Sequence, residues 1–208
     1  MTNRPRRAET AGEPRLRLFV AVELPEAWLE ALGRLMEQLK AALAREPKTS
    51  SARLRWVRPE GIHCTLKFLG GVTPDRLNPI EAALSGAVNA PPAIRLEVGA
   101  PGTFGRSPRV VWAGMKGDVG ALTALAGRID AALAPLGFES ERRPFSPHLT
   151  IARLPDDLPP EVRATVARIA SALTAPDVAP FSVERISLMR SFLSPGGARY
   201  ERVASFPA

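Results

Sequence analysis

Both histidines of the chain belong to the same tripeptide pattern, His-x-Thr. The pattern occurs as His63-Cys64-Thr65 and again as His148-Leu149-Thr150. Side chains two residues apart on a β-strand point to the same face of the sheet. If both tripeptides lie on strands, each histidine shares a face with its own threonine, and the residue between them points the other way.

Two imidazoles and two hydroxyls in one cleft suit the cleavage of a phosphodiester. A histidine titrates near pH 6.5, so one ring can be a neutral general base while the other is a protonated general acid. Each role contributes about 10²–10⁴ in rate. The threonine hydroxyls can donate hydrogen bonds to phosphate oxygens on which charge develops. The residues alone do not distinguish the acid from the base.

Two other chemistries are excluded by the same pattern. Cys64 is the only cysteine, and its parity on the strand points it away from His63, which argues against a Cys–His nucleophilic pair. A metal site would need carboxylate or thiol companions at ligand spacing, and the two histidines have none. We therefore expect no metal, because an imidazolium supplies the positive charge, and no cofactor.

The predicted elements repeat the order strand, helix, strand with a histidine, helix, strand. Strands are expected at 16–24, 62–69 and 94–98, then at 110–115, 148–153 and 181–190, with further short strands at 55–57 and 200–206. Helices are expected at 26–45, 74–88, 119–136 and 159–173. The halves meet in a Gly/Pro-rich stretch at 99–108. Two such halves usually pack about an approximate two-fold axis, which would face the histidine strands across a cleft.

Length, charge and hydropathy limit the classes of protein to which the chain can belong. A length of 208 residues suits one compact domain or two lobes sharing a core. The net charge of +7 favours anionic partners, although arginine-rich chains also arise from codon bias. Residues 1–14 are polar and lack the apolar middle of a secretory signal, so we expect a disordered basic tail before a domain spanning 15–208. No apolar run approaches the roughly 20 residues of a membrane span, which favours a cytoplasmic protein without a membrane partner.

The motifs together resemble a known family. They are RLFVAVELP, RWVRPEGIHCTLKFLG, PRVVWAG, FSPHLTIAR and ISLMRSFLSPGGARYERVASFP. The chain resembles the two-histidine phosphoesterase superfamily, specifically the RNA 2',3'-cyclic phosphodiesterases once described as 2'-5' RNA ligases. The resemblance implies an α+β fold that is bilobal, with two pseudo-symmetric halves whose antiparallel sheets flank a central cleft and whose helices lie outside.

The resemblance also implies an activity and roles for the motif residues. The activity is metal-independent hydrolysis of a terminal 2',3'-cyclic phosphate to a 2'-phosphate, on RNA ends or nucleoside 2',3'-cyclic phosphates. His63 corresponds to the proton donor and His148 to the proton acceptor. Thr65 and Thr150 correspond to the phosphate-binding hydroxyls.

Three further residues near the motifs are candidates for substrate binding. Phe68 and Arg153 each follow their motif histidine by five residues, and similar proteins use an aromatic there to stack a base and an arginine there near the phosphate. Strict alternation points both away from the histidines, and a bulge at the strand end would be needed to reverse this. For Phe68 we favour core packing over stacking, and for Arg153 both interpretations stand. Lys67 shares the face of His63 by parity and is a candidate phosphate contact.

Other side chains form a second set of candidates. Arg55, Arg58, Arg142 and Arg143 lie in or near loops that lead to the motifs, and form either a basic rim or an ordinary solvated surface. Tyr200 is either a cleft residue or a packed one.

Two alternatives to hydrolysis are open. A non-enzymatic RNA-end-binding module would bind without turnover, although it has no need of two titrating groups. Ligation through a 2'-5' linkage is the reverse reaction, which water opposes. No adenylation lysine motif is visible, which argues against an ATP-dependent ligase. A monomer is expected.

Overall fold

Two antiparallel sheets form the centre of the computed structural model, which describes residues 15–88, 93–194 and 197–207. The first sheet has the strand order β3-β1-β8-β9 and the second β2-β6-β5-β4-β7. The strands are β1 (Leu16–Glu23), β2 (Arg55–Trp56), β3 (His63–Val72), β4 (Arg95–Thr103), β5 (Val110–Gly117), β6 (His148–Arg153), β7 (Phe181–Ser182), β8 (Arg185–Ser194) and β9 (Gly197–Pro207). The predicted α+β class with antiparallel sheets is confirmed. The predicted basic tail, residues 1–14, lies outside the described residues.

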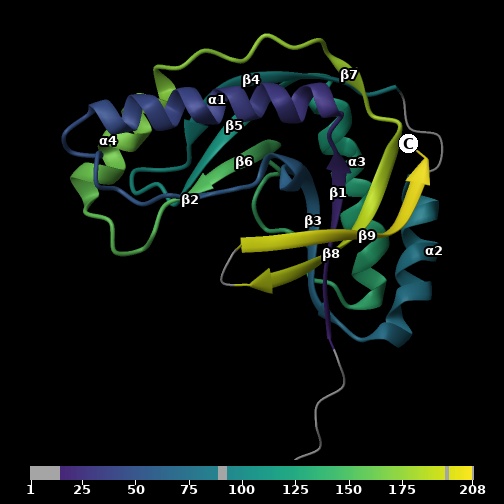
Figure 1. Cartoon of the computed structure of the whole chain (residues 1–208). Coiled ribbons are helices and arrows are strands. Elements are labelled where there is room, and N and C mark those ends of the chain that lie inside the picture. Colours follow the sequence, from purple (N-terminus) through teal and green to yellow (C-terminus); the bar gives the residue numbers. More distant parts are fainter. Residues whose placement is uncertain (1–14, 89–92, 195–196, 208) are drawn as a thin grey trace, which may run out of the picture.

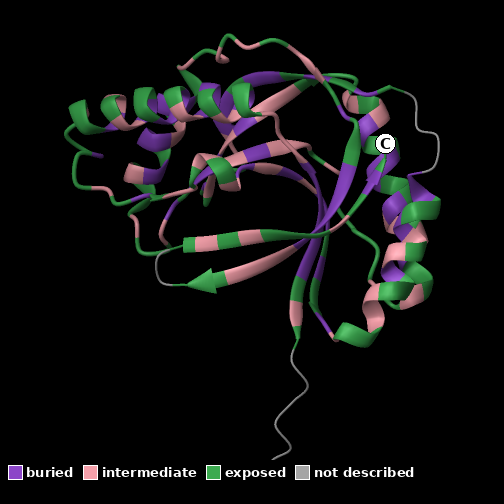
Figure 2. Ribbon diagram, turned by 45° about the vertical axis from the view of Figure 1, so that its right-hand side comes forward, coloured by how far each residue is buried: buried purple, intermediate pink, exposed green. Residues whose placement is uncertain are grey.

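In the described part of the chain, four α-helices cover the two sheets in pairs (Figure 1). They are α1 (Glu26–Arg45), α2 (Leu77–Ala87), α3 (Val119–Leu133) and α4 (Pro160–Ser171). Helix α2 packs beside α3 over the first sheet, and α1 packs beside α4 over the second. In Figure 2 the strands and the inner helix faces carry most of the buried residues, and the outer helix faces are exposed.

The two sequence halves exchange their last strands. Strand β4, which closes the first half of the sequence, pairs with β5 in the second sheet. Strand β8, from the second half, pairs with β1 in the first sheet. The predicted junction at 99–108 is therefore not a lobe boundary, because β4 runs into it as far as Thr103. Each sheet contains strands from both halves.

Glycines explain why β4 continues through a segment that composition predicts as a loop. A Cβ atom on Gly102 would lie 2.6 Å from the Cη2 atom of Trp112, on the neighbouring strand β5. A Cβ atom on Gly99 would lie 3.1 Å from the backbone of Gly114. Glycine inside a strand commonly marks such a close approach. The same residues that read as loop signals are those that let β4 and β5 pair.

Helix α1 shows how the apolar periodicity builds the core. Its buried residues recur at helical spacing and are Trp28, Ala31, Leu32, Leu35, Met36, Leu39 and Leu43. Pro25 stands immediately before the helix, where its fixed φ and missing N–H cost nothing. The indole of Trp28 donates to the Ala179 carbonyl at 2.9 Å and packs edge-on against Phe181. Helix α1 is thereby joined to the segment that leads into β7.

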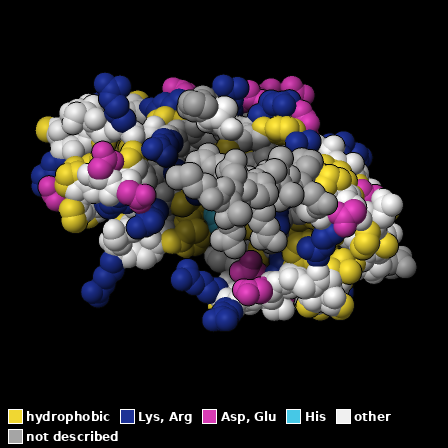
Figure 3. Space-filling view, turned by 90° about the horizontal axis from the view of Figure 1, so that it is seen from below, with side chains coloured by type: hydrophobic (Ala, Val, Ile, Leu, Met, Phe, Trp, Pro, Cys, Tyr) yellow, Lys and Arg dark blue, Asp and Glu magenta, His cyan; other side chains and the backbone are white. Residues whose placement is uncertain are grey.

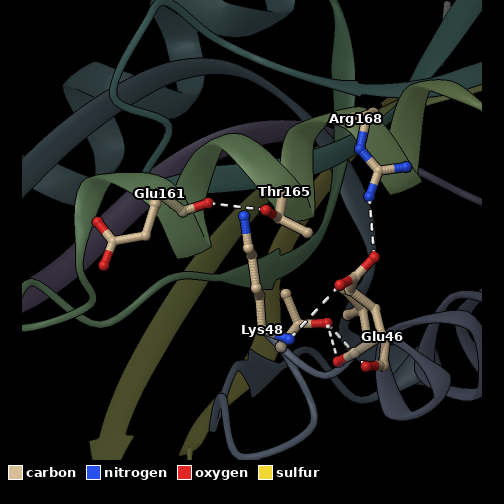
Figure 4. Close-up of polar contacts among 7 residues, drawn as sticks. Glu46, Lys48, Glu161, Thr165 and Arg168 are labelled. Atoms are coloured by element: carbon tan, nitrogen blue, oxygen red, sulfur yellow. Dashed lines mark hydrogen bonds and ion pairs between the residues drawn. The ribbon is translucent and has the colours of Figure 1, made fainter.

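Polar contacts also join the end of α1 to α4 (Figure 4). The Arg168 guanidinium of α4 lies 3.0 Å from the Glu46 carboxylate, just after α1. In the same view the Thr165 hydroxyl donates to the Glu161 carbonyl within α4 at 2.8 Å. Exposed ion pairs of this kind contribute at most about 1 kcal/mol. The α1–α4 pairing therefore depends mainly on apolar packing.

Among the residues that the structure describes, one helical segment meets the length and composition expected of a membrane span. Residues 119–136 have a mean hydropathy of 1.3 over 18 residues, although no such run was expected from the sequence. Leu122, Leu125, Ile129 and Leu133 of this segment are fully buried against the rest of the protein. The core helix of a globular fold has the same composition, and α3 packs on α2 and β3 in this way.

Candidate active site

The two His-x-Thr units line one cleft of about 930 Å³. His63 is the first residue of β3, and His148 is the first residue of β6. Thr65 and Thr150 line the same cleft, as strand parity predicts. The structure therefore brings together the four motif side chains from two different sheets.

Both imidazoles are oriented by the same local contact. Nδ1 of His63 lies 2.9 Å from the Gly61 carbonyl oxygen, and Nδ1 of His148 lies 2.8 Å from the Ser146 carbonyl oxygen. A carbonyl oxygen only accepts, so each Nδ1 carries the hydrogen and donates it. Each Nε2 is left to exchange a proton with a bound molecule. This arrangement can perform paired general acid–base chemistry.

The ring of His63 lies against two aromatic side chains. It stacks on Phe19 with ring centroids 4.7 Å apart and meets Tyr200 edge-on at 4.9 Å. This burial lowers the pKa of His63 below its ordinary value. The Gly61 carbonyl and the Glu23 carboxylate act in the opposite direction, while the charges of Arg153 and His148 lower the pKa further.

The ring of His148 has a different environment. Its one aromatic neighbour among the described residues is Phe104, which it meets edge-on with centroids 4.9 Å apart. Phe104 lies just after β4 and is 41% exposed. The two histidines are equivalent in the pattern of strands but not in their surroundings.

Glu23 forms an ion pair beside the first histidine. It is the strand partner of His63 in the β1–β3 ladder. Its carboxylate receives two hydrogen bonds from the Arg202 guanidinium, at 2.7 and 2.8 Å, and one from the Ser187 hydroxyl. The Arg202 hydrogen bond is the largest cause that holds the pKa of Glu23 below its usual range. The carboxylate is therefore ionised and contributes negative charge near His63.

Matching β-bulges decide where the residues after the motifs point. In the β1–β3 ladder, Val20 pairs with Lys67 and Ala21 with Thr65, so Leu66 is an extra residue. In the β5–β6 ladder, Val111 pairs with Ala152 and Trp112 with Thr150, so Ile151 is extra. Each bulge shifts the alternation by one position after the threonine. Both halves carry this bulge at the third residue after the motif histidine.

The bulges place Phe68 and Arg153 on the cleft. Both residues line it, and Phe68 is 61% exposed with its ring 6.2 Å from that of Phe19. Core packing, which the sequence favoured for Phe68, is therefore wrong. A bulge, the condition for a cleft position, is present in both halves, within β3 at Leu66 and near the end of β6 at Ile151. A role of Phe68 and Arg153 in substrate binding stays a prediction.

Lys67 is one of the residues that line the cleft, but its ammonium is directed toward α3. Its side chain is 2% exposed, and its ammonium donates to the Asp130 carboxylate and to the Glu139 carbonyl. Two of the three ammonium N–H groups are thereby engaged. Lys67 joins β3 to α3 and to the loop that precedes β6, and the phosphate contact predicted for it stays a prediction.

Cys64 points into the core, as its parity predicts. It is fully buried, and burial raises the pKa of its thiol to about 12. A thiol in this state is a poor nucleophile at neutral pH.

The remaining basic candidates divide into two groups. Arg143 lines the cleft, and Arg142 lines an adjoining hollow. Arg55 and Arg58 line neither. Tyr200, for which the sequence left two interpretations, lines the cleft against His63.

Four residues around the histidines were not identified from sequence. They are Arg17, Phe19, Glu23 and Phe104. Parity along β1 was the available signal for the first three, since odd-numbered residues of this strand face away from the helices. Phe104 had no such signal, because it lies after β4 in a stretch predicted as a loop.

The face in Figure 3 carries many Lys and Arg side chains, with Asp and Glu side chains among them. A small histidine surface is visible there beside hydrophobic side chains. Within residues 15–88, 93–194 and 197–207, no group of three or more His, Cys, Asp or Glu side chains is arranged to hold a metal ion.

Comparison with known proteins gives a family match and named relatives. A family model described as the 2'-5' RNA ligase superfamily matches residues 25–191. An RNA 2',3'-cyclic phosphodiesterase of Methanothermobacter thermautotrophicus is 30% identical over 92% of this chain and 98% of its own length. One of Geobacillus stearothermophilus is 34% identical over 83% of this chain, and the match spans 54% of that protein, about half of its length.

The fold also matches solved structures. The apo form of E. coli LigT superposes with a TM-score of 0.71 at 24% sequence identity, covering 94% of this chain and 98% of LigT. LigT has also been solved in complex with 3'-AMP. At this identity the likeness shows a shared fold.

Proposed function

The chain belongs to the 2'-5' RNA ligase superfamily, and we propose from this membership that it is an RNA 2',3'-cyclic phosphodiesterase. The observation that carries the proposal is the pair of His-x-Thr units on one cleft. Two relatives that match most of the chain bear this enzyme name. The substrate is an RNA end or a nucleoside 2',3'-cyclic phosphate.

The reaction is a hydrolysis by paired general acid–base catalysis. His148 accepts a proton from water through Nε2 as the water oxygen forms a bond to phosphorus. The bond between phosphorus and the ribose 3'-oxygen breaks, and His63 donates a proton to that oxygen. The products are a 3'-hydroxyl and a 2'-phosphate. The imidazolium supplies the positive charge, so the step needs no metal ion.

The threonines and Arg153 stabilise charge on the phosphate. The hydroxyls of Thr65 and Thr150 donate hydrogen bonds to its non-bridging oxygens, on which charge develops in the transition state. The Arg153 guanidinium, which lies on the same cleft, suits bidentate contact with such oxygens. Phe68 stacks on the terminal base. A cytoplasmic location and a monomeric state remain predictions.

A short RNA ending in a 2',3'-cyclic phosphate tests the proposal with EDTA present. We expect turnover, and a loss of about 10²–10⁴ in rate for His63→Ala and for His148→Ala. Arg34→Ala, on the exposed side of α1, is the control and should leave the rate unchanged. The products are separated by chromatography.

Three outcomes contradict parts of this scheme. Full activity in both histidine variants would exclude the acid–base pair. A 3'-phosphate product would reverse the assigned bond cleavage. Binding of the RNA end without turnover would favour the non-enzymatic binding module.

A further inference from the structure

A second hollow of about 640 Å³ lies directly beside the candidate active site. It shares Phe68, Gly70, Glu141 and Arg143 with the cleft. Phe68 stands at the border of the two hollows and is 61% exposed. A chain that leaves the cleft on this side therefore passes Phe68 and enters the second hollow.

The lining of the second hollow has the donors and acceptors that a nucleotide needs. Arg142 and Arg143 are exposed, and within the described part of the chain neither forms an ion pair. Their guanidinium groups suit a phosphodiester oxygen. The carboxylates of Glu139 and Glu141 line the same hollow and can accept hydrogen bonds from base amino groups. Mixed charge of this kind fits a nucleotide better than a free anion.

Aromatic side chains also line the hollow. They are Phe68 and Phe138. The Arg76 guanidinium lies over the Phe138 ring at 4.6 Å and donates to the Leu136 carbonyl. Any base can stack on an aromatic ring, because every base has a π-face.

The wall of the hollow is held in place before any ligand binds. The ammonium of Lys67 donates to the Glu139 carbonyl and to Asp130, and the Asp130 carboxylate accepts the backbone N–H of Glu141 at 3.3 Å. The segment 139–141 is thereby fixed to β3 and α3. A fixed wall lowers the entropic cost of ordering the site on binding.

We propose that this hollow binds the nucleotide immediately 5' to the cyclic-phosphate nucleotide, with Arg142 on the phosphodiester that joins the two. The proposal rests on the proposed function, since it assumes that the terminal cyclic phosphate lies between the histidines. It makes the substrate an RNA of at least two nucleotides. A mononucleotide 2',3'-cyclic phosphate occupies only the cleft.

The test compares a mononucleotide and a dinucleotide that both end in a 2',3'-cyclic phosphate. We expect the wild-type protein to have a kcat/KM at least about tenfold higher for the dinucleotide, as one charge-assisted contact predicts. Arg142→Ala should remove most of this advantage and change mononucleotide turnover by less than about twofold. The exposed Arg34→Ala on α1 is the matched control and should change neither. Equal losses on both substrates in Arg142→Ala, or no wild-type preference, would overturn the proposal.

Salt dependence and product binding give independent readouts. Loss of one phosphate contact should reduce the slope of log affinity against log salt by about 0.7 for a single strand.

Binding of a dinucleotide and a mononucleotide that end in a 2'-phosphate is measured by calorimetry in wild type and Arg142→Ala. If neither cyclic substrate is hydrolysed, the proposed function fails, and equal affinities for the two products would then overturn the second subsite as well. A dinucleotide advantage that Arg142→Ala abolishes would support the subsite even without turnover.

Discussion

The two catalytic candidates differ most in what surrounds each imidazole. His63 lies against Phe19 and Tyr200, and this burial lowers its pKa. A general acid must be protonated, so the free enzyme carries the active form of His63 only below this lowered pKa. A bound cyclic phosphate brings negative charge that favours the protonated ring. Because kcat/KM reports the ionisations of the free enzyme, deprotonation of His63 should limit kcat/KM on the alkaline side.

Replacing Glu23 tests the assignment of His63 as the acid. Glu23→Gln removes a charge that raises the pKa of His63, so this pKa should fall further, and the unpaired Arg202 acts in the same direction. The alkaline limb of the kcat/KM profile should then move to lower pH, because kcat/KM reports the ionisations of the free enzyme. The pH–rate profile gives the limb, and an NMR titration of the His63 ring gives the pKa directly. Movement of the acidic limb instead would identify His63 as the base.

Phe68 provides a second prediction for a single residue. Phe68→Ala should weaken substrate binding by about 1–3 kcal/mol, or roughly 5- to 150-fold in KM, because a stacking surface is lost. The melting temperature should change little, since this side chain is 61% exposed. Phe68→Trp keeps a stacking ring and serves as the control. A large loss of stability without a change in KM would indicate that the ring packs in the core.

At the scale of elements, the sequence predicted which strands carry the site but not their irregularities. Strand parity placed Thr65, Thr150 and Cys64 correctly. It failed for Phe68, because the extra residue Leu66 in β3 reverses the alternation. A bulge depends on how two strands pair, and that pairing is absent from the local pattern. The matching bulge at Ile151 was visible only as an equal offset of Phe68 and Arg153 from their histidines.

The strand pairing within 99–108 and the exchange of strands between the halves were not predicted, for a related reason. Gly and Pro in 99–108 are local signals of a turn, but here Gly99 and Gly102 allow close strand pairing. The ion pair of Lys67 with Asp130 joins residues 63 positions apart. Contacts of this range arise from the packing of the whole chain. The local periodicity of the sequence therefore does not predict such long-range contacts.

The Lys67–Asp130 ion pair gives a prediction at this scale. Asp130→Ala leaves a buried ammonium with the Glu139 carbonyl, and should reduce the free energy of unfolding by about 1.5–3 kcal/mol. It also releases the wall at 139–141, so KM should rise more than kcat falls. Denaturant unfolding and steady-state kinetics measure the two effects.

A double mutant identifies the source of that loss. Lys67→Met removes the buried charge, so adding Asp130→Ala to it should cost less than Asp130→Ala costs alone. Strictly additive losses would indicate that the two side chains do not interact.

At the scale of the whole molecule, the exchange of strands makes the two lobes dependent on each other. The first sheet needs β8 and β9 from the end of the chain, and the second needs β4 from its middle. Both helix layers likewise combine one helix from each half of the sequence. The cleft lies between sheets that each contain strands from both halves, so the positions of His63 and His148 depend on the complete domain.

Dividing the chain tests this dependence. A cut at Gly105, an exposed position with φ of +67°, separates the halves at the junction that sequence pattern suggests. Neither the fragment 15–104 nor the fragment 106–207 should fold alone, because each sheet would lose strands and expose its apolar face. Circular dichroism should show no cooperative thermal transition for either fragment, whereas the intact chain should unfold in one. Mixing the fragments should restore structure and turnover together. A cooperative transition in one isolated fragment would mean that the lobes fold independently, and that the strand exchange only joins two stable units.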